Sequence, residues 1–145
     1  MLIKDMGILD AKADAIVLDG SDLLKPAAGV SEKLFERASC LLKDQCDRLG
    51  FTDAARACCT RSFGGAEAEY VIHVLSPEKG CEGDRELLAR TYKEAIGVAV
   101  YNGWKKLAVM LLGVERGGWD EDEAAEIAEK ALAELPEGME ITLYK

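Results

Sequence analysis

The stretch of sequence that decides the fold is AIVLDGSDLL (residues 15–24), which runs directly into KPAAGV (residues 25–30). A short apolar segment stops at a loop of Asp, Gly, Ser and Pro residues, and a sequence with helical periodicity begins after that loop. This order is typical of a strand covered on both faces that leads through a loop into the start of a helix. In α/β proteins the backbone N–H groups at such a helix start face a crevice where ligands bind.

Composition and charge limit the classes of protein to which the chain can belong. Its 145 residues, 49% hydrophobic and 31% charged, are enough for one domain with its own core, so we expect a single domain over residues 1–145. The net charge of −9 argues against general binding to nucleic acid or to anionic membranes, because both need a basic surface. Asp5 and Asp10 interrupt the apolar residues that a signal peptide would need, and no apolar run could span a bilayer. These features predict a cytoplasmic protein.

The cysteines and the single histidine give no sign of a metal centre. No two cysteines form a C-x-x-C pair, and a zinc site would need ligands at a recognisable spacing, so we expect neither a metal nor a cofactor. An odd number of cysteines without a signal peptide suggests reduced thiols. The five are Cys40, Cys46, Cys58, Cys59 and Cys81. His73 lies within an apolar segment, where a hydrogen-bonded core histidine is the simpler interpretation.

Strand and helix patterns alternate along the chain. The predicted strands cover residues 1–4, 14–18, 55–63, 70–75, 107–114 and 139–144, and the predicted helices run from 31 to about 49, from 84 to 102 and from 120 to about 135. Ser31, Asp84 and Asp120 are the expected N-terminal caps, and Gly50 and Gly103 the expected helix stops. The alternation predicts an α/β fold, a three-layer α/β/α sandwich with a mixed, mostly parallel central sheet. The strand over 107–114 is the most hydrophobic, so we expect it near the centre of that sheet.

Two glycine-containing loops follow the ends of predicted strands. One covers residues 19–29 and the other residues 113–120. Ligands of such sheets bind beyond the carboxyl ends of the strands. If the two preceding strands are neighbours, the two loops flank one crevice, which is then the expected ligand site.

Three segments resemble the macro domain, a family that binds ADP-ribose. Residues 14–17 are similar to the D-A-I-V strand of that family, residues 70–73 match its Y-V-I-H strand, and residues 124–128 resemble the helix after its second ligand loop. The shared order of elements covers nearly the whole chain. The resemblance implies the macro domain's α/β/α fold and a nucleotide-like small molecule, such as ADP-ribose, as the partner.

The first ligand loop departs from the family pattern. Gly7 stands where the family usually has an Asp that accepts a hydrogen bond from the adenine amino group, and the family's N-A-A-N motif aligns with residues 18–21. Ser21 therefore replaces the Asn that orients the distal ribose and the reacting water, and Ser31 replaces an Asp of the hydrolytic members. The family's glycine run falls on residues 26–29, of which only the last is glycine. These replacements indicate little or no hydrolase activity.

The second ligand loop keeps its glycines only in part. Alignment with the family's S-T-G-x-x-G-x-P pattern places Glu115 on the first glycine, Gly118 on the second and Asp120 on the proline. Trp119 stands where an aromatic ring usually stacks near the ribose, and because an exposed indole is costly unless it covers something, a ring-stacking role is one of two open interpretations, beside a purely structural one. Arg116 can offset the negative charge of the site by pairing with a phosphate or with Glu115.

From these alignments we expect a defined set of ligand contacts. They are Gly20, Ser21, Gly29, Val30, Glu115, Arg116, Gly117, Gly118 and Trp119. No catalytic residue is assigned. Asp19 and Asp22 are the only carboxylates that could stand in as a base, and a simpler interpretation makes them turn residues whose side chains satisfy nearby amides.

Three functions stay open on the sequence alone. The first is a divergent macro domain that binds ADP-ribose or a related molecule with little or no hydrolysis. The second is a degenerate scaffold with a closed or repurposed pocket that acts in protein interaction, which residues 26–28 and Glu115 favour. The third is a hydrolase that removes ADP-ribose or a terminal phosphate, with Asp19 or Asp22 activating water. The sequence does not give the oligomeric state.

Overall fold

The computed structural model describes residues 2–4, 7–20, 24, 29–50 and 56–144. Strands and helices alternate along these residues, as the sequence predicts. The strands are β1 (Leu2–Lys4), β2 (Ala15–Asp19), β3 (Ala57–Arg61), β4 (Tyr70–Val74), β5 (Lys106–Met110) and β6 (Glu140–Tyr144). The helices are the 3₁₀ turn η1 (Ile8–Asp10), α1 (Val30–Arg37), α2 (Cys40–Leu49), α3 (Asp84–Asn102) and α4 (Glu121–Ala131).

The described strands form one six-stranded sheet in the order β1-β6-β5-β2-β4-β3. Every pair is parallel except β3 with β4, which is antiparallel, so the predicted mixed, mostly parallel sheet is confirmed. β5 and β2 occupy the two central positions and are neighbours, with Ala15 opposite Leu107 and Val17 opposite Val109. All five residues of β2 are buried, because both faces of the sheet are covered at its centre.

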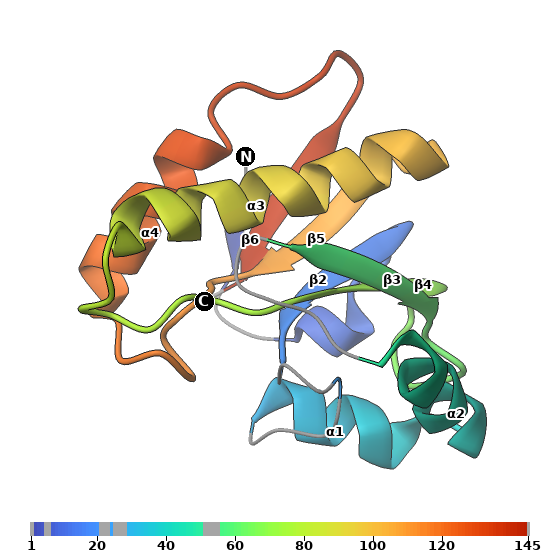
Figure 1. Cartoon of the computed structure of the whole chain (residues 1–145). Coiled ribbons are helices and arrows are strands. Elements are labelled where there is room, and N and C mark those ends of the chain that lie inside the picture. The colour runs from blue at the N-terminus through green and yellow to red at the C-terminus, as the bar shows by residue number, and fades with distance from the viewer. Residues whose placement is uncertain (1, 5–6, 21–23, 25–28, 51–55, 145) are drawn as a thin grey trace.

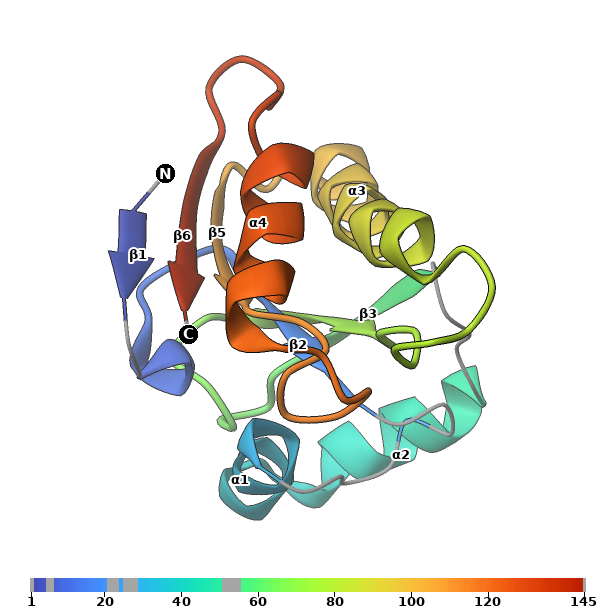
Figure 2. The same ribbon diagram turned by 90° about the vertical axis from the view of Figure 1, so that its left-hand side faces the viewer.

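Helices cover both faces of the sheet, as Figures 1 and 2 show. α3 and α4 pack against each other on one face, while η1, α1 and α2 lie on the other. This is the predicted three-layer sandwich. None of the described helices is both long enough and apolar enough to cross a membrane.

The predicted helix over residues 31–49 is wrong as a single helix, because the chain breaks it in two. Ala38 is extended (φ −77°, ψ 157°), and Ser39 caps α2 through a hydrogen bond that its side chain accepts from the Leu41 N–H at 3.4 Å. The break follows from a close approach to the segment after β3. A Cβ on Gly65 would lie 2.7 Å from the Leu34 carbonyl oxygen, and the Ser39 N–H donates to Phe63 O at 2.9 Å.

The structure also corrects two of the three predicted caps. The N-cap of α1 is Gly29, and Ser31 lies buried inside the helix. The N-cap of α3 is Gly83, whose left-handed backbone places Asp84 in the first turn, where its carboxylate accepts from the Gly80 N–H at 2.8 Å. The prediction for Asp120 is confirmed, since its carboxylate accepts hydrogen bonds from the first turn of α4.

The strand predicted over residues 107–114 ends earlier, at Met110. Leu111 and Leu112 stay buried but leave the strand ladder: the Leu111 N–H donates to Tyr144 O, and the Leu112 N–H donates to the Tyr92 hydroxyl at 2.8 Å. The apolar run is therefore longer than the strand, because a buried turn continues it. This turn directs the following loop towards the start of α1.

Candidate functional site

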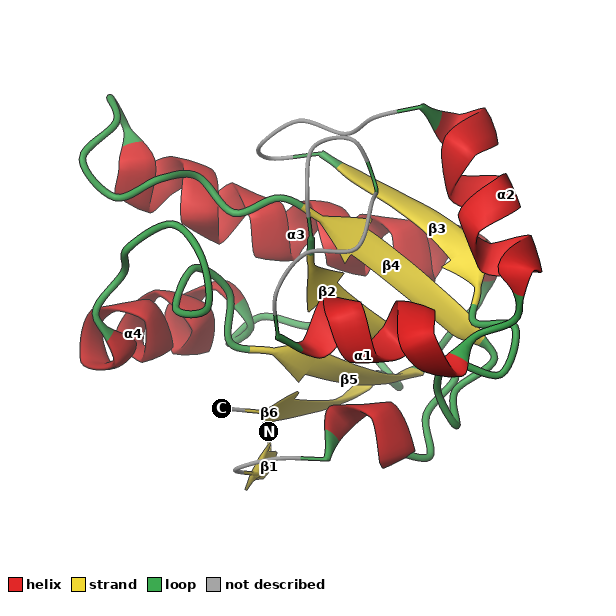
Figure 3. Cartoon of the chain, turned by 90° about the horizontal axis from the view of Figure 1, so that it is seen from below, coloured by secondary structure: helices red, strands yellow, loops and turns green. Residues whose placement is uncertain are grey.

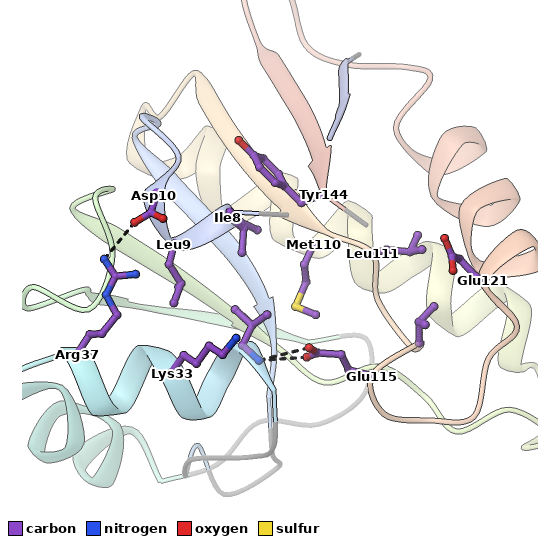
Figure 4. Close-up of a pocket in the computed structure, with 13 residues that line it drawn as sticks. Ile8, Leu9, Asp10, Lys33, Arg37, Met110, Leu111, Glu115, Glu121 and Tyr144 are labelled. Atoms are coloured by element: carbon purple, nitrogen blue, oxygen red, sulfur yellow. Dashed lines mark hydrogen bonds and ion pairs between the residues drawn. The ribbon is translucent and has the colours of Figure 1, made fainter. Parts of the chain in front are cut away.

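A cavity of about 380 Å³ opens at the carboxyl ends of β5 and β6 (Figure 4). Helix α1 covers this side of the sheet (Figure 3). This size lies within the usual range for small-molecule sites. Its walls come from η1, α1, the segment that follows β5, and the start of α4. The lining residues are Gly7, Ile8, Leu9, Asp10, Val30, Lys33, Arg37, Met110, Leu111, Val114, Glu115, Glu121 and Tyr144.

One part of the cavity is apolar and another carries charge. Ile8 of η1 and Met110 at the end of β5 are buried hydrophobic residues of this lining. Lys33 and Arg37, which lie four residues apart on α1, add positive charge, and Arg37 pairs with the carboxylate of Asp10 at 3.2 Å. The cavity can therefore hold a molecule that has both an apolar ring and a polar or anionic portion.

The carboxylate of Glu115 lies at the N-terminus of α1. The Val30 N–H donates to its two oxygens at 3.3 and 3.4 Å (Figure 4). Gly29, the residue before, has φ +85°, and a Cβ there would lie 2.5 Å from Glu115 Oε1. Gly29 has no side chain to cap α1, so Glu115 satisfies one amide from a loop that is 85 residues further along the chain.

Asp19, at the end of β2, forms hydrogen bonds with the segments that follow β4 and β5. Its carboxylate is 3% exposed and accepts hydrogen bonds from the Ser76 N–H at 3.1 Å, the Ser76 hydroxyl at 2.6 Å and the Gly113 N–H at 3.1 Å. Burial raises the pKa of Asp19, while these hydrogen bonds and the positive charge of Arg116 act in the opposite direction. The expectation that the Asp19 side chain satisfies nearby amides is confirmed, although Asp19 is the last residue of β2 and not a turn residue.

The loop after β5 depends on glycine. Gly113, Gly117 and Gly118 have φ values of +90°, +92° and +74°. A Cβ on Gly113 would lie 2.5 Å from Trp119 Cδ1, so this position tolerates no side chain while the indole is in place. Among the described residues, none accepts a hydrogen bond from the backbone amides of residues 115–118. Such a run of amides at the carboxyl end of a sheet is suited to an anion.

Trp119 is buried, which favours the structural interpretation of this residue. The indole is 4% exposed, its Nε1–H donates to Pro77 O at 2.8 Å, and the ammonium of Lys79 lies 4.7 Å from the ring centre. The ammonium of Lys79 also forms an ion pair with Glu123 of α4, and the backbone N–H of Lys79 donates to Gly117 O at 2.7 Å. The ring therefore anchors the loop on the segment that follows β4.

Arg116, on the loop that follows β5, buries part of its guanidinium group. Its Nη1 is buried and has no hydrogen-bond partner within the described part of the chain. Arg116 belongs to none of the ion pairs between described residues, and its charge acts on Asp19. The expected pairing of Arg116 with Glu115 is therefore not formed in this structure, and the guanidinium keeps capacity for an acceptor.

Comparison with known proteins gives the family of the chain. The family model described as "Macro domain" matches residues 21–128. The chain belongs to the macro domain family. A macro domain-containing protein of Cupriavidus necator is 29% identical over 90% of this chain and 81% of its own length. One of Streptomyces coelicolor is 30% identical over 83% of this chain and 75% of its own length.

Solved macro domain structures share the fold. The Oceanobacillus iheyensis macro domain with ADP superposes with a TM-score of 0.91 at 18% identity, covering 98% of this chain and 80% of that one. The Trypanosoma brucei macro domain in complex with ADP-ribose gives a TM-score of 0.85 at 20% identity, covering 98% of this chain and 61% of that one. The fold of this macro domain is therefore the one expected from its sequence.

The residues predicted for the site of this macro domain fall into four groups. One group, Arg116, Gly117, Gly118 and Trp119, belongs to the loop after β5 but does not line the cavity. Val30 and Glu115 line the cavity, and Gly29 adjoins them. Gly20 follows β2 and its N–H donates to Val74 O at 3.0 Å, so that amide is already used. Ser21 and Asp22 lie outside the described residues.

Sequence reasoning missed much of the cavity lining. Lys33 and Arg37 line it from α1, and Tyr144 lines it from the end of β6. The sequence did contain a signal for Lys33 and Arg37. Residues three or four apart lie on the same face of a helix, so both share a face with Val30 at the start of α1. Nothing in the local sequence indicates Tyr144, which reaches the cavity only because β6 lies beside β5.

The histidine and the cysteines lie away from the cavity lining. His73 is buried, with Nε2 2.8 Å from the Thr60 hydroxyl, and burial lowers its pKa to about 4. The predicted core histidine is confirmed. Burial raises the pKa of the Cys46 and Cys58 thiols to about 11 each, which leaves them protonated and poorly nucleophilic at neutral pH.

Proposed function

We propose that this macro domain binds ADP-ribose, or a small molecule of the same nucleotide class, with little or no hydrolysis. The observation that carries the proposal is the position of the cavity between two sets of backbone amides. Val30 lines the cavity from the first turn of α1, and Val114 and Glu115 line it from the start of the loop after β5, whose amides at residues 115–118 donate to no described residue. Helix N-termini and glycine-rich loops both bind phosphate through backbone N–H groups. The Trypanosoma brucei relative of this fold was solved in complex with ADP-ribose.

In the proposed complex, the apolar part of the cavity holds the adenine ring. Ile8, Leu9 and Met110 supply contact area there. Gly7 has no side chain to accept a hydrogen bond from the adenine amino group, so discrimination among bases should be weaker than in relatives that have an Asp. The diphosphate is proposed to lie against the amides of Val30 and of residues 115–118.

Positive charge supports the same placement. Arg116 has a buried nitrogen that finds no acceptor within the described residues, and Lys33 lines the cavity on the same side as Val30. The remaining proposed contacts are Gly20, Ser21, Gly29, Gly117 and Gly118. For Trp119 we propose that the ring holds the loop in shape, because its indole is tied to Pro77.

Little or no hydrolysis is proposed because Asp19, the candidate base that the structure describes, is not placed to activate water. Asp19, one of the two candidates, accepts three hydrogen bonds and is 3% exposed. A general base must reach the water that it deprotonates. The other candidate, Asp22, lies outside the described residues.

A second function, a scaffold with a repurposed pocket that acts in protein interaction, is favoured by one observation. The Glu115 carboxylate contacts the Val30 N–H, which the first proposal assigns to the ligand. A permanent contact of this kind would exclude a diphosphate.

Calorimetric titration with ADP-ribose at neutral pH and low salt tests the first proposal against the second. Micromolar binding supports a ligand-binding macro domain, and no heat at millimolar ADP-ribose rejects it in favour of the scaffold. Chromatography of ADP-ribose 1″-phosphate incubated with the protein tests the hydrolytic alternative. Release of phosphate that scales with protein concentration would contradict the proposal of little or no hydrolysis.

A further inference from the structure

We infer that Glu115 is a built-in competitor for the anionic part of the ligand, so that the cavity selects ligands by the charge they bring to α1. The inference rests on the proposed function and assigns the residue that regulates the same site. The carboxylate lies 3.3 and 3.4 Å from the Val30 nitrogen and in contact range of Gly29. It therefore occupies the position at the helix start where an external anion would receive the same hydrogen bond.

The surroundings of Glu115 leave it able to move. The side chain is exposed, and the sole hydrogen-bond donor that it contacts among the described residues is the Val30 N–H. Its neighbours Gly117 and Gly118 permit backbone changes that other residues would resist. Displacement exchanges one charge-assisted hydrogen bond for another, so a dianionic ligand can compete with the carboxylate, whereas an uncharged ligand has no means of doing so.

The charge balance of the site makes this competition selective. Arg116, on the same loop, keeps a buried nitrogen without a described acceptor. An arriving phosphate group therefore displaces the Glu115 carboxylate, and the positive charge of Arg116 on the same loop favours that exchange. Ile8 and Met110 line the cavity from η1 and the end of β5, whereas Glu115 contacts the Val30 N–H at the start of α1 (Figure 4). An uncharged nucleoside can therefore use the apolar part of the cavity without displacing Glu115.

The predicted consequence is a separation between charged and uncharged ligands. Removing the carboxylate in Glu115→Gln or Glu115→Ala should increase the affinity for pyrophosphate and for ADP-ribose about tenfold, because a like charge at the anion position disappears. The affinity for adenosine, which carries no phosphate, should change less than about twofold.

Glu32→Gln is the matched control. Glu32 is an exposed carboxylate in the first turn of α1, so its removal changes the charge of the same helix end. It does not line the cavity and belongs to none of the described ion pairs. A general electrostatic effect would increase the affinity for anions in Glu32→Gln as well as in the Glu115 variants. An effect of freeing the Val30 N–H would appear only in the Glu115 variants.

The experiment is a nitrogen-15 NMR titration of the four proteins with pyrophosphate, followed at the Val30 amide, with calorimetry for ADP-ribose and adenosine. The inference predicts that the Val30 signal moves on Glu115→Gln without ligand, and that pyrophosphate then binds about tenfold more tightly than to wild type. It is overturned if the Glu115 variants bind pyrophosphate within about twofold of wild type, or if Glu32→Gln gains as much.

The ADP-ribose arm separates the two proposals. If Glu115→Ala gains pyrophosphate affinity and none of the proteins binds ADP-ribose, the internal competitor is supported and the proposed ligand is rejected. If wild type binds ADP-ribose and the Glu115 variants bind it no more tightly, the ligand is supported and the competitor is rejected.

Discussion

The carboxylate of Asp19 accepts a hydrogen bond from the Gly113 N–H at 3.1 Å, which joins the end of β2 to the start of the second ligand loop, 94 residues away. The same carboxylate accepts two further hydrogen bonds from Ser76, after β4. One buried side chain thus sets the spacing of three chain segments at the edge of the sheet where the cavity opens. The position of the end of β2 relative to the segments that follow β4 and β5 depends on this acceptor.

Asp19→Asn should destabilise the fold. An amide keeps one acceptor oxygen but turns an NH₂ group towards a donor, so at least one buried donor loses its partner and the free energy of unfolding should fall by about 1–3 kcal/mol. Urea unfolding measures the change, and Ser76→Ala in the same background should show that the two effects are not additive. Unchanged stability together with lost ADP-ribose binding would instead make Asp19 a direct ligand contact.

His73 should make the protein less stable in mild acid. Its folded-state pKa is about 4 and its ordinary value is 6.5, so between these values the unfolded chain binds a proton that the folded one does not. Stability therefore falls as the pH drops from 6.5 towards 4, with a slope of up to about 1.4 kcal/mol per pH unit from this group. Urea unfolding of wild type and His73→Gln across this range should give a shallower slope for the variant. An NMR titration that placed the His73 pKa near 6.5 would refute the argument.

The buried Trp119 ring should stabilise the fold and be protected from quenchers in solution. Its Nε1–H bonds to Pro77 O and it carries Lys79 on its face, so Trp119→Phe should cost about 1–2 kcal/mol of stability. In Trp104→Phe, the remaining fluorescence comes from Trp119 and should resist quenching by acrylamide. Strong quenching that ADP-ribose relieves would support the ring-stacking interpretation that the sequence left open.

Lys33 should contribute to ligand binding through its charge. It lines the cavity from α1 and is exposed, so Lys33→Ala should weaken ADP-ribose binding only about two- to fivefold, and less at high salt. Lys43→Ala, an equally exposed lysine on α2 that does not line the cavity, controls for the overall change in charge. Equal losses in both variants would show that ligand attraction is not localised at the cavity.

The parts of the fold that followed from the sequence are those set by local patterns. The buried strand over Ala15–Asp19, the Gly50 and Gly103 helix stops and the Asp120 cap depend on residues close in the chain. The central position of β5 followed from its apolar character, whereas the sequence left open whether β2 is its neighbour, as the structure shows it to be. The family resemblance added the order of elements, which local patterns alone do not supply.

The parts that the sequence did not predict depend on distant partners. The break at Ser39 needs the close approach of Gly65, the burial of Trp119 needs the Pro77 carbonyl 42 residues away, and α1 starts at Gly29 beside a carboxylate from position 115. Ser31 is a reasonable cap by local preference. Ser31 is not the cap, because Gly29 takes the N-cap position. The carboxylate of Glu115, distant in the chain, accepts the hydrogen bond from the Val30 N–H.

Gly29→Ala should report on the Glu115 contact through stability alone, without any ligand. A Cβ at this position meets the Glu115 carboxylate at 2.5 Å on a backbone with φ +85°, so the variant carries both strain and a clash and should lose about 2 kcal/mol or more. Gly80→Ala is the control, since Gly80 has φ +98° with nothing within 4 Å of the added Cβ and carries the strain alone. In the Glu115→Ala background the cost of Gly29→Ala should fall to that of Gly80→Ala, as measured by urea unfolding. If the cost is the same in both backgrounds, Glu115 does not rest on the start of α1 in solution, and the charge-competition argument loses its structural basis.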